Sequence, residues 1–361
     1  MGTARLGRLC LGLLASVIVA TGVVACGDDD DSGSAASDGS SSQELTTVKT
    51  TYMNILALAP LFAGEEAGIF EKNGIKNEYE NVNLYEALPL IAQGRQDVGI
   101  MAASAAFYNA INQGQQVVAV ADRLTYDCSS DNKLVVRKEL FDQGVKTYKD
   151  LEGKTLAILG EGTATQYWND KLADENGMSA DSFKSIKELG YPETLTALET
   201  GGVDAGYLAE PLLSQAIEKG VAEPIIPMYE VVPGDDVGFM IYSKKFADEN
   251  PEAAQAWMKS WLESVRYYLD PANKDAVVAA VSKWTEIPEE SLAAMYGTDS
   301  WPWMNPNGAV NVDGPERAMD WMLERKFIET APETSAWYDD QFVTSAVEEL
   351  GESDSDACAS R

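Results

Sequence analysis

The amino-acid sequence predicts an α/β fold of two lobes, in which each lobe is a mostly parallel sheet flanked by helices and a cleft lies between the lobes. Three observations predict this class: an internal repeat, the alternation of strand and helix patterns, and a length of 361 residues, which is enough for two hydrophobic cores. The repeat carries the most information.

The repeat relates the segment 88–99 to the segment 195–206, at a constant shift of 107 positions (195 minus 88). The first copy reads LPLIAQGRQDVG and the second reads LTALETGGVDAG. In each copy an apolar helical pattern ends at a glycine, Gly94 or Gly201, and a short strand pattern follows. An Asn-Gly pair precedes each copy, and a helical pattern that closes at a glycine follows each copy. Three matches in the same order indicate that one structural unit occurs twice.

Strand patterns alternate with helical patterns, as in parallel sheets with helices on both faces. Apolar runs typical of buried strands occupy 98–101, 117–121, 134–136 and 155–159. Near the C-terminal third, a helix is predicted to start at about Pro251, with Trp257, Trp261 and Val265 at helical spacing. We interpret this aromatic stripe as core packing.

The N-terminal residues 1–25 predict a lipoprotein signal peptide. Arg5 and Arg8 precede an uncharged stretch over 9–25, and Cys26 follows a small residue, as in the lipobox whose cysteine receives a diacylglycerol before cleavage. An ordinary signal peptide cut nearby and a retained anchor helix are the alternatives. All three place the body outside the cytoplasm, and the lipid would anchor it to the outer face of the bacterial cell membrane, on the periplasmic side.

The rest of the chain is predicted to form a tether and two lobes. Residues 26–44 are acidic and rich in Ser and Gly, which is typical of a flexible spacer. We place lobe one at 45–137 and 232–361, and lobe two at 138–231. The chain would therefore cross between the lobes twice.

The composition excludes several classes of function. The formal charge is −31, and it becomes −33 without residues 1–25, which hold two arginines and no acids, so a nucleic-acid partner is not expected. The chain has no histidine, which removes Ser/His and Cys/His nucleophiles and histidine metal sites. We expect a monomer with no cofactor, no metal and no catalytic residues, although the many carboxylates leave a paired-acid glycosidase open on composition alone.

Two cysteines remain after the signal peptide, with its Cys10, and the lipidated Cys26 are set aside. In an oxidising compartment Cys128 and Cys358 are expected to form a disulfide that ties the polar C-terminal tail to the body. Two unpaired thiols are the alternative.

Ligands of open parallel sheets bind beyond the carboxyl ends of the strands, where helix N-termini offer free N–H groups. The best single candidate is the glycine-containing loop that opens a helix after a strand pattern, and its proposed ligand-binding residues are Gly162, Thr163, Ala164, Thr165 and Gln166. The alternative is a tight turn capped by Thr163.

Further candidates follow other strand patterns. Ser104 is placed to contact ligand or to cap a helix, and Asn54 to reach the cleft or to bind its own loop. Arg123 would clamp an anion or form a surface ion pair.

Further ligand-binding candidates in the second lobe are Glu210, Tyr207 and Trp168. Glu210 closes the strand that contains Tyr207, and an acid there favours a ligand with N–H or cationic groups. Trp168 or its neighbour Tyr167 would offer a stacking surface to the ligand, while the other packs inside.

Several motifs together resemble the sulfonate, taurine, nitrate and thiamine-precursor group of periplasmic binding proteins, the SsuA/TauA type. The matching segments are APLFA at 59–63, AGIFEKNGI at 67–75, the first copy of the repeat, KDLEGKT at 149–155, GVDA at 202–205 with Glu210-Pro211, and Asn250-Pro251-Glu252. The similarity covers nearly all of the mature chain.

The resemblance implies a type II periplasmic-binding-protein fold that closes on its ligand and delivers it to an ABC permease driven by a separate ATPase. It places ligand at the loop from Asn54 to Pro60, near Ser104, and at Gly162 to Gln166. A sulfonate, a nitrate-like anion, a pyrimidine or another aromatic molecule all remain open as ligand. The same family includes a pyrimidine synthase that sacrifices a histidine and needs a cysteine cluster, and this chain has neither.

Overall fold

The structure is a computed structural model that describes residues 44–353. The predicted signal peptide, nearly all of the predicted tether, Cys26 and Cys358 lie outside the described residues. Within residues 44–353, none of the helices combines the length and the apolar character that crossing a membrane requires.

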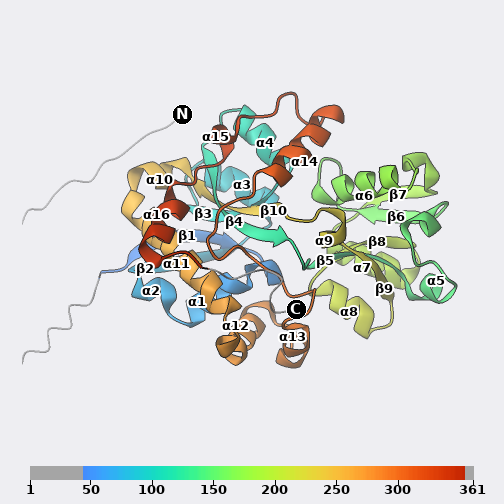
Figure 1. The fold of residues 1–361 in the computed structure, drawn as a ribbon, viewed down its shortest axis with the longest axis horizontal. Coiled ribbons are helices and arrows are strands. Elements are labelled where there is room, and N and C mark those ends of the chain that lie inside the picture. Colours follow the sequence, from blue (N-terminus) through green and yellow to red (C-terminus); the bar gives the residue numbers. More distant parts are fainter. Residues whose placement is uncertain (1–43, 354–361) are drawn as a thin grey trace, which may run out of the picture. The chain divides into compact units, whose positions relative to one another are not determined.

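The described chain forms two mixed five-stranded sheets flanked by helices (Figure 1), which confirms the predicted two-lobed α/β fold. The first sheet has the order β2-β1-β3-β10-β4 and the second has the order β7-β6-β8-β5-β9. The strands of the first sheet are β1 (Thr46–Tyr52), β2 (Ile75–Asn81), β3 (Val98–Ala102), β4 (Val117–Tyr126) and β10 (Asp235–Ser243). The strands of the second sheet are β5 (Asn132–Arg137), β6 (Thr155–Ile158), β7 (Ser185–Glu188), β8 (Ala205–Ala209) and β9 (Ala222–Pro227).

Helices cover both sheets. Those of the first lobe are α1 (Ala59–Glu66), α2 (Ile69–Lys72), α3 (Leu84–Ala92), α4 (Ala105–Asn112), α10 (Lys244–Glu249), α11 (Pro251–Leu269), α12 (Lys274–Thr285), α13 (Glu289–Met295), α14 (Asp313–Glu324), α15 (Thr334–Trp337) and α16 (Gln341–Leu350). Those of the second lobe are α5 (Lys138–Asp142), α6 (Ala164–Glu175), α7 (Tyr191–Thr200), α8 (Leu212–Glu218) and α9 (Met228–Val231).

The repeat seen in the sequence is a repeat in topology. Strands β1, β2 and β3 hold the same places in the first sheet as β6, β7 and β8 hold in the second, and each set is parallel. The glycines that end α3 and α7 are both left-handed, with φ of 64° at Gly94 and 75° at Gly201. A residue with a Cβ is strained in this conformation, which explains why both copies carry glycine there.

Strand β10 in the first sheet and strand β5 in the second run antiparallel to their neighbours. Each of these two strands directly follows a segment that crosses between the sheets. The crossings occupy 127–131 and 228–234, and they lie side by side: Tyr126 pairs with Asp235, and Lys133 pairs with Pro227. Strand β5, which the boundary at 137 assigned to lobe one, lies in the second sheet. The apolar runs of β4 and β5 are both fully buried strands, so the pattern does not show which sheet each one joins.

The long helix α11 begins at Pro251, as the sequence predicts, and packs against α1 and α16. Trp257, Trp261 and Val265 are fully buried in the first lobe's core. Their interpretation as core residues is therefore confirmed.

Cys128 lies in the first crossing, 127–131, and is disulfide-bonded. We predict that its partner is Cys358, which lies outside the described residues, because no other cysteine remains in the mature chain apart from Cys26. Peptide mapping of the purified protein without reductant should yield one peptide pair that contains both cysteines. Free alkylation of both thiols would contradict this prediction. An unstrained bridge of this span would add about 2–4 kcal/mol to the free energy of unfolding.

Candidate functional site

The carboxyl ends of strands from both lobes approach each other. Ser104 follows β3 at the N-cap position of α4, where its side chain makes no capping hydrogen bond. The backbone N–H of the next residue, Ala105, donates a 3.2 Å hydrogen bond to the carbonyl oxygen of Gly162 in the second lobe. Glu210 follows β8 at the equivalent place in the second lobe. The ends of the parallel strands are the usual location of a ligand in such sheets.

Arg123 is the most unusual residue in this region. It lies on β4, and its side chain rests against the backbone of Gly238 on the neighbouring strand β10, where a Cβ would collide with the guanidinium. Only 6% of the residue is exposed, yet within residues 44–353 the guanidinium makes neither a hydrogen bond nor an ion pair, and its Nε is sealed from solvent. Burial lowers the pKa of Arg123, and the nearby Asp131 carboxylate opposes this effect. A largely buried cation with no acceptor among residues 44–353 is costly, so an acceptor from outside these residues, on a ligand or a water molecule, is expected.

Asp131 faces Arg123 from the first crossing between the lobes. Its Oδ1 accepts hydrogen bonds from the hydroxyl of Tyr126 at 2.8 Å and from Nδ2 of Asn132 at 2.9 Å. Burial raises the pKa of Asp131, while these two donors and Arg123 lower it. The hydroxyl of Tyr191, the first residue of α7, donates to Oδ1 of Asn132 at 2.6 Å, so the second lobe is bound into the same network.

Two tyrosines from different lobes close this region. Burial raises the pKa of Tyr191, and the fields of Asp131, Tyr85 and Arg123 all reach its hydroxyl. Tyr85 stands in the first turn of α3, and the hydroxyl of Ser104 lies near its own. The Oγ of Ser104 is itself buried and makes no hydrogen bond of good geometry. We call the group Tyr85, Ser104, Arg123, Asp131, Tyr191 and Glu210 the Arg123 site.

Glu210 is joined to the Arg123 site through its backbone. Its N–H donates to the carbonyl oxygen of Asp131 at 2.9 Å, and its carboxylate accepts from the N–H of Ser214 at 3.1 Å. The side chain is buried, and this burial raises the pKa of Glu210 to about 7, against the lowering effect of Ser214.

We predict that Glu210 makes the folded protein less stable as the pH rises. Its pKa in the fold lies above the ordinary value of 4.5. Its contribution to the free energy of unfolding is therefore complete below pH 4.5 and is lost as the pH rises through about 7. The loss is of the order of 3 kcal/mol. Urea unfolding at pH 5 and pH 8 should show a smaller difference between the two pH values in Glu210→Gln than in the wild type. An equal difference in both proteins would show that Glu210 ionises normally.

A second pair of buried acids lies behind Arg123. Asp122 accepts hydrogen bonds from the backbone N–H groups of Leu124 and Asn305, both at 2.8 Å, and Asp236 accepts from the hydroxyl of Thr125 and the N–H of Asn311. Burial raises the pKa of both acids, to about 6 for Asp122 and further for Asp236, where the Asp122 charge adds to the effect. Burial and mutual repulsion therefore oppose the simultaneous ionisation of both acids.

The loop 160–166 uses its polar groups within its own turn. Thr163 donates to the carbonyl oxygen of Gly160 at 2.6 Å, the N–H of Leu159 binds Oγ1 of Thr165 at 2.8 Å, and the N–H of Gly162 binds Oε1 of Gln166 at 2.8 Å. Ala164 lines a pocket of only about 20 Å³ beside Asp235 and Asp236, which has room for one water molecule. This geometry favours the interpretation of the loop as a tight turn.

The other sequence candidates are exposed, buried in a core or bound to partners of their own. Asn54 is exposed and accepts a hydrogen bond from Asn81 at 3.0 Å, and Pro60 is buried in the first turn of α1. Trp168 and Tyr207 lie in the core of the second lobe with ring centres 6.0 Å apart, which favours a structural role for both. Ser104, Arg123 and Glu210 are the candidates that come together.

Tyr85, Asp131 and Tyr191 were missed by the sequence analysis. A signal existed for the two tyrosines, because each stands at the start of the helix that ends at the repeated glycine. Asp131 lies in a polar run, Ser129-Ser130-Asp131-Asn132, directly before an apolar strand. Nothing local to that run indicates that it faces an arginine.

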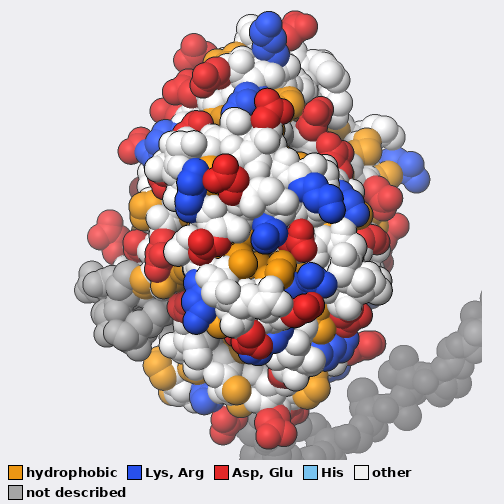
Figure 2. Space-filling model, turned by 90° about the vertical axis from the view of Figure 1, so that its right-hand side faces the viewer, with side chains coloured by type: hydrophobic (Ala, Val, Ile, Leu, Met, Phe, Trp, Pro, Cys, Tyr) orange, Lys and Arg blue, Asp and Glu red, His pale blue; other side chains and the backbone are white. Residues whose placement is uncertain are grey.

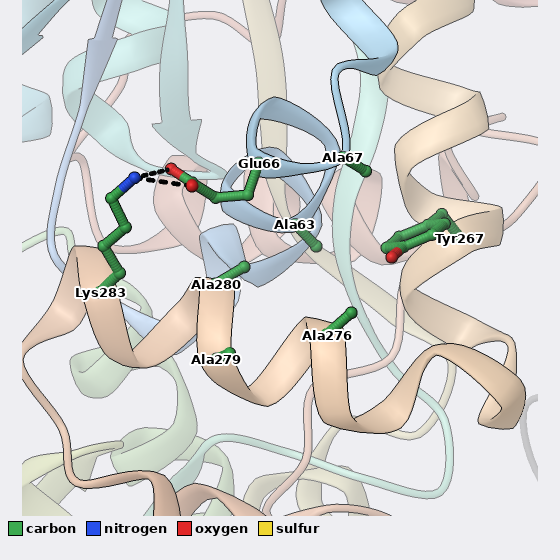
Figure 3. Close-up of a pocket in the computed structure, with 8 residues that line it drawn as sticks. All are labelled: Ala63, Glu66, Ala67, Tyr267, Ala276, Ala279, Ala280 and Lys283. Carbon is green, nitrogen blue, oxygen red and sulfur yellow. Dashed lines mark hydrogen bonds and ion pairs between the residues drawn. The ribbon is translucent and has the colours of Figure 1, made fainter.

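Other surface features offer weaker sites. A groove of about 230 Å³ between α1, α11 and α12 is lined mainly by alanines, and its two charged residues, Glu66 and Lys283, bind each other at 2.7 Å (Figure 3). Among residues 44–353, no group of three or more acids or cysteines is placed to hold a metal ion. The face in Figure 2 shows acidic and basic side chains interspersed, without a broad basic patch.

Comparison with known proteins agrees with this fold. A curated relative, the bicarbonate transport ATP-binding protein CmpC of Synechococcus elongatus, is 22% identical over 277 residues, which are 71% of this chain and 40% of the relative. The chain thus spans about two fifths of that relative's length.

Two solved structures have the same fold. The periplasmic nitrate-binding protein NrtA of Synechocystis has a TM-score of 0.72 and 14% identity, and the match covers 85% of this chain and 90% of that chain. A sulfonate ABC transporter's periplasmic sulfonate-binding protein SsuA, from Methylobacillus flagellatus, has a TM-score of 0.65 and 21% identity, and covers 85% and 96%. These likenesses show the fold that the sequence motifs predicted.

The NMT1-like family matches residues 41–282, which is more than half of the chain. The protein therefore belongs to the NMT1-like family.

Proposed function

We propose that the protein is an extracytoplasmic lipoprotein that captures a small organic molecule or anion and delivers it to the permease of an ABC importer. The observation that carries this proposal is the buried guanidinium of Arg123, which has no acceptor within residues 44–353. A hydrogen-bond acceptor on the ligand would supply the missing partner, and a hydrogen bond to a charged group contributes about 1.5–3 kcal/mol.

Two sets of contacts between the lobes support binding by closure. Asp170 of the second lobe accepts from Nε1 of Trp321 at 3.1 Å and pairs with Arg325 at 2.9 Å. Lys133 of the second lobe pairs with Asp299 at 2.7 Å. A ligand that contacts both lobes would favour this closed arrangement, which the permease would then recognise.

The test of the proposal is saturable binding without turnover. We expect one small molecule to raise the melting temperature of the purified protein in a concentration-dependent way and to be recovered unchanged. A sulfonate, a nitrate-like anion, a pyrimidine and other aromatic molecules form the first panel. Conversion of the bound molecule to a product would instead support the second candidate, an enzyme on the same scaffold.

The proposed anchor predicts the effect of a single substitution. Cys26→Ala should abolish incorporation of labelled fatty acid and release the protein from the membrane fraction, because the cysteine sulfur carries the lipid. Cys10→Ala is the matched control, since Cys10 lies inside the predicted signal peptide and should leave labelling unchanged. Labelling that persists in Cys26→Ala would disprove the lipoprotein assignment.

The partners proposed with this function are the permease and its ATPase. We propose that the protein acts as a monomer that touches the membrane through the lipid alone.

A further inference from the structure

The charges around Arg123 restrict the ligand further than the fold does. Arg123 lies in the fields of two buried carboxylates, Asp131 and Asp122. The neighbouring bases are already neutralised, because Lys133 pairs with Asp299 and Arg317 pairs with Asp235. Two buried carboxyl groups, those of Asp131 and Asp122, therefore lie near the single guanidinium of Arg123 before any ligand enters.

An anionic ligand would add another acidic group beside these two carboxyl groups in a desolvated region. Like charges in a buried site oppose one another strongly, and among residues 44–353 no second cation without an acidic partner lies there to compensate for them. A neutral ligand with a carbonyl oxygen satisfies the donors of Arg123 and leaves the charge balance unchanged.

The acceptors of the Arg123 site call for donors on the ligand. Tyr126 and Asn132 both bind Oδ1 of Asp131, and no side chain among residues 44–353 donates to Oδ2. A ligand that presents an N–H group beside its acceptor would bridge Asp131 and Arg123, which are too far apart for an ion pair with each other. Tyr191 and the partly exposed Tyr85 lie near this region from opposite lobes, and aromatic side chains suit contact with a planar molecule.

We infer that the Arg123 site binds an uncharged, planar molecule that carries a carbonyl acceptor next to an N–H donor, such as an amide, urea or imide group, and that it rejects simple oxyanions. This inference rests on the proposed function and restricts the chemical class of the ligand. It separates this chain from NrtA and SsuA, whose names specify nitrate and sulfonate.

The test compares probes that have the same shape and differ in charge. Calorimetry and thermal shift would use benzamide against benzoate, nicotinamide against nicotinate, and orotamide against orotate, together with nitrate, bicarbonate and ethanesulfonate. We expect the neutral member of each pair to bind at least ten times more tightly than its anion, and the three remaining anions not to stabilise the protein.

The variant Asp131→Asn supplies a second measurement. It removes one negative charge and keeps an acceptor for Tyr126, so the preference for the neutral member of each pair should narrow or reverse. The comparison in the wild type needs no variant, and its result stands if Asp131→Asn folds poorly.

Mass spectrometry of the molecule released from the purified wild-type protein distinguishes failure of the ligand inference from failure of the proposed binding function. A neutral amide-like molecule supports the inference. A released oxyanion, or tighter binding of the anionic probes, overturns the inference and leaves the binding function intact. If no molecule is released and no probe of either charge stabilises the protein, the proposed function itself fails.

Discussion

Replacing Arg123 with methionine should weaken binding of the natural ligand by at least about 100-fold and leave the unliganded protein at least as stable as the wild type. The loss follows because the guanidinium supplies buried, charged donors to the ligand, and removing one partner of such a contact costs about 2–5 kcal/mol. The gain in stability follows because methionine has a similar volume and removes an unpartnered buried charge. Titration calorimetry with the ligand released from the wild type measures the first effect, and urea unfolding measures the second.

Arg95→Met is the matched control for this prediction. Arg95 is exposed at the end of the repeated helix, so its substitution should change neither binding nor the free energy of unfolding by more than a few tenths of a kcal/mol. A strong loss of stability in Arg123→Met, together with native affinity, would mean that Arg123 is structural and that the ligand binds elsewhere.

Gly162→Val should prevent the lobes from closing and weaken binding by about ten-fold to 100-fold. Gly162 is left-handed, with φ of 68°, and a Cβ there would lie 2.9 Å from the Cβ of Ala105 in the other lobe. The added side chain therefore pushes apart the two strand ends that meet through the Ala105 to Gly162 hydrogen bond. Small-angle scattering should show that ligand reduces the radius of gyration of the wild type and does not reduce that of the variant.

Gly177→Val separates backbone strain from the contact between lobes. Gly177 has a similar φ of 60°, but a Cβ there meets no atom within 4 Å. Both variants should lose about 1–2 kcal/mol of folding free energy from strain, and only Gly162→Val should lose affinity. Equal affinity in the two variants would show that the contact between Gly162 and Ala105 plays no part in closure.

The sequence could predict the fold because the signals for it are local. A dozen consecutive residues encode a helix that ends at a glycine, Gly94 or Gly201, and the strand that follows it. The recurrence of this pattern indicates the second lobe. The sheet that β5 joins depends on a pairing with β8 and β9, some 70 to 90 positions away, so its placement was not readable from the apolar run.

The site was predicted less well, because its residues acquire their meaning from partners in the other lobe. Arg123 was found as a polar residue after an apolar strand, but its burial opposite Asp131 depends on the first crossing. The loop at Gly162 offers donors in the sequence, and Gln166, four positions later, occupies its N–H. A hydrogen bond between a loop's own polar groups can be recognised only once the conformation of the turn is known.

The two crossings determine how the lobes can move. They run side by side, joined at the first lobe by the hydrogen bond from Gly234 N–H to the Tyr126 carbonyl at 2.6 Å, and at the second lobe by Met228 N–H to Oγ of Ser130 at 2.9 Å. A single connection would allow the lobes to swivel in any direction, whereas two connections tied to each other resist torsion and favour bending about one axis. Under the proposed function, each opening would then return the two lobes to the same register, and a captured molecule would reach the permease in one fixed orientation.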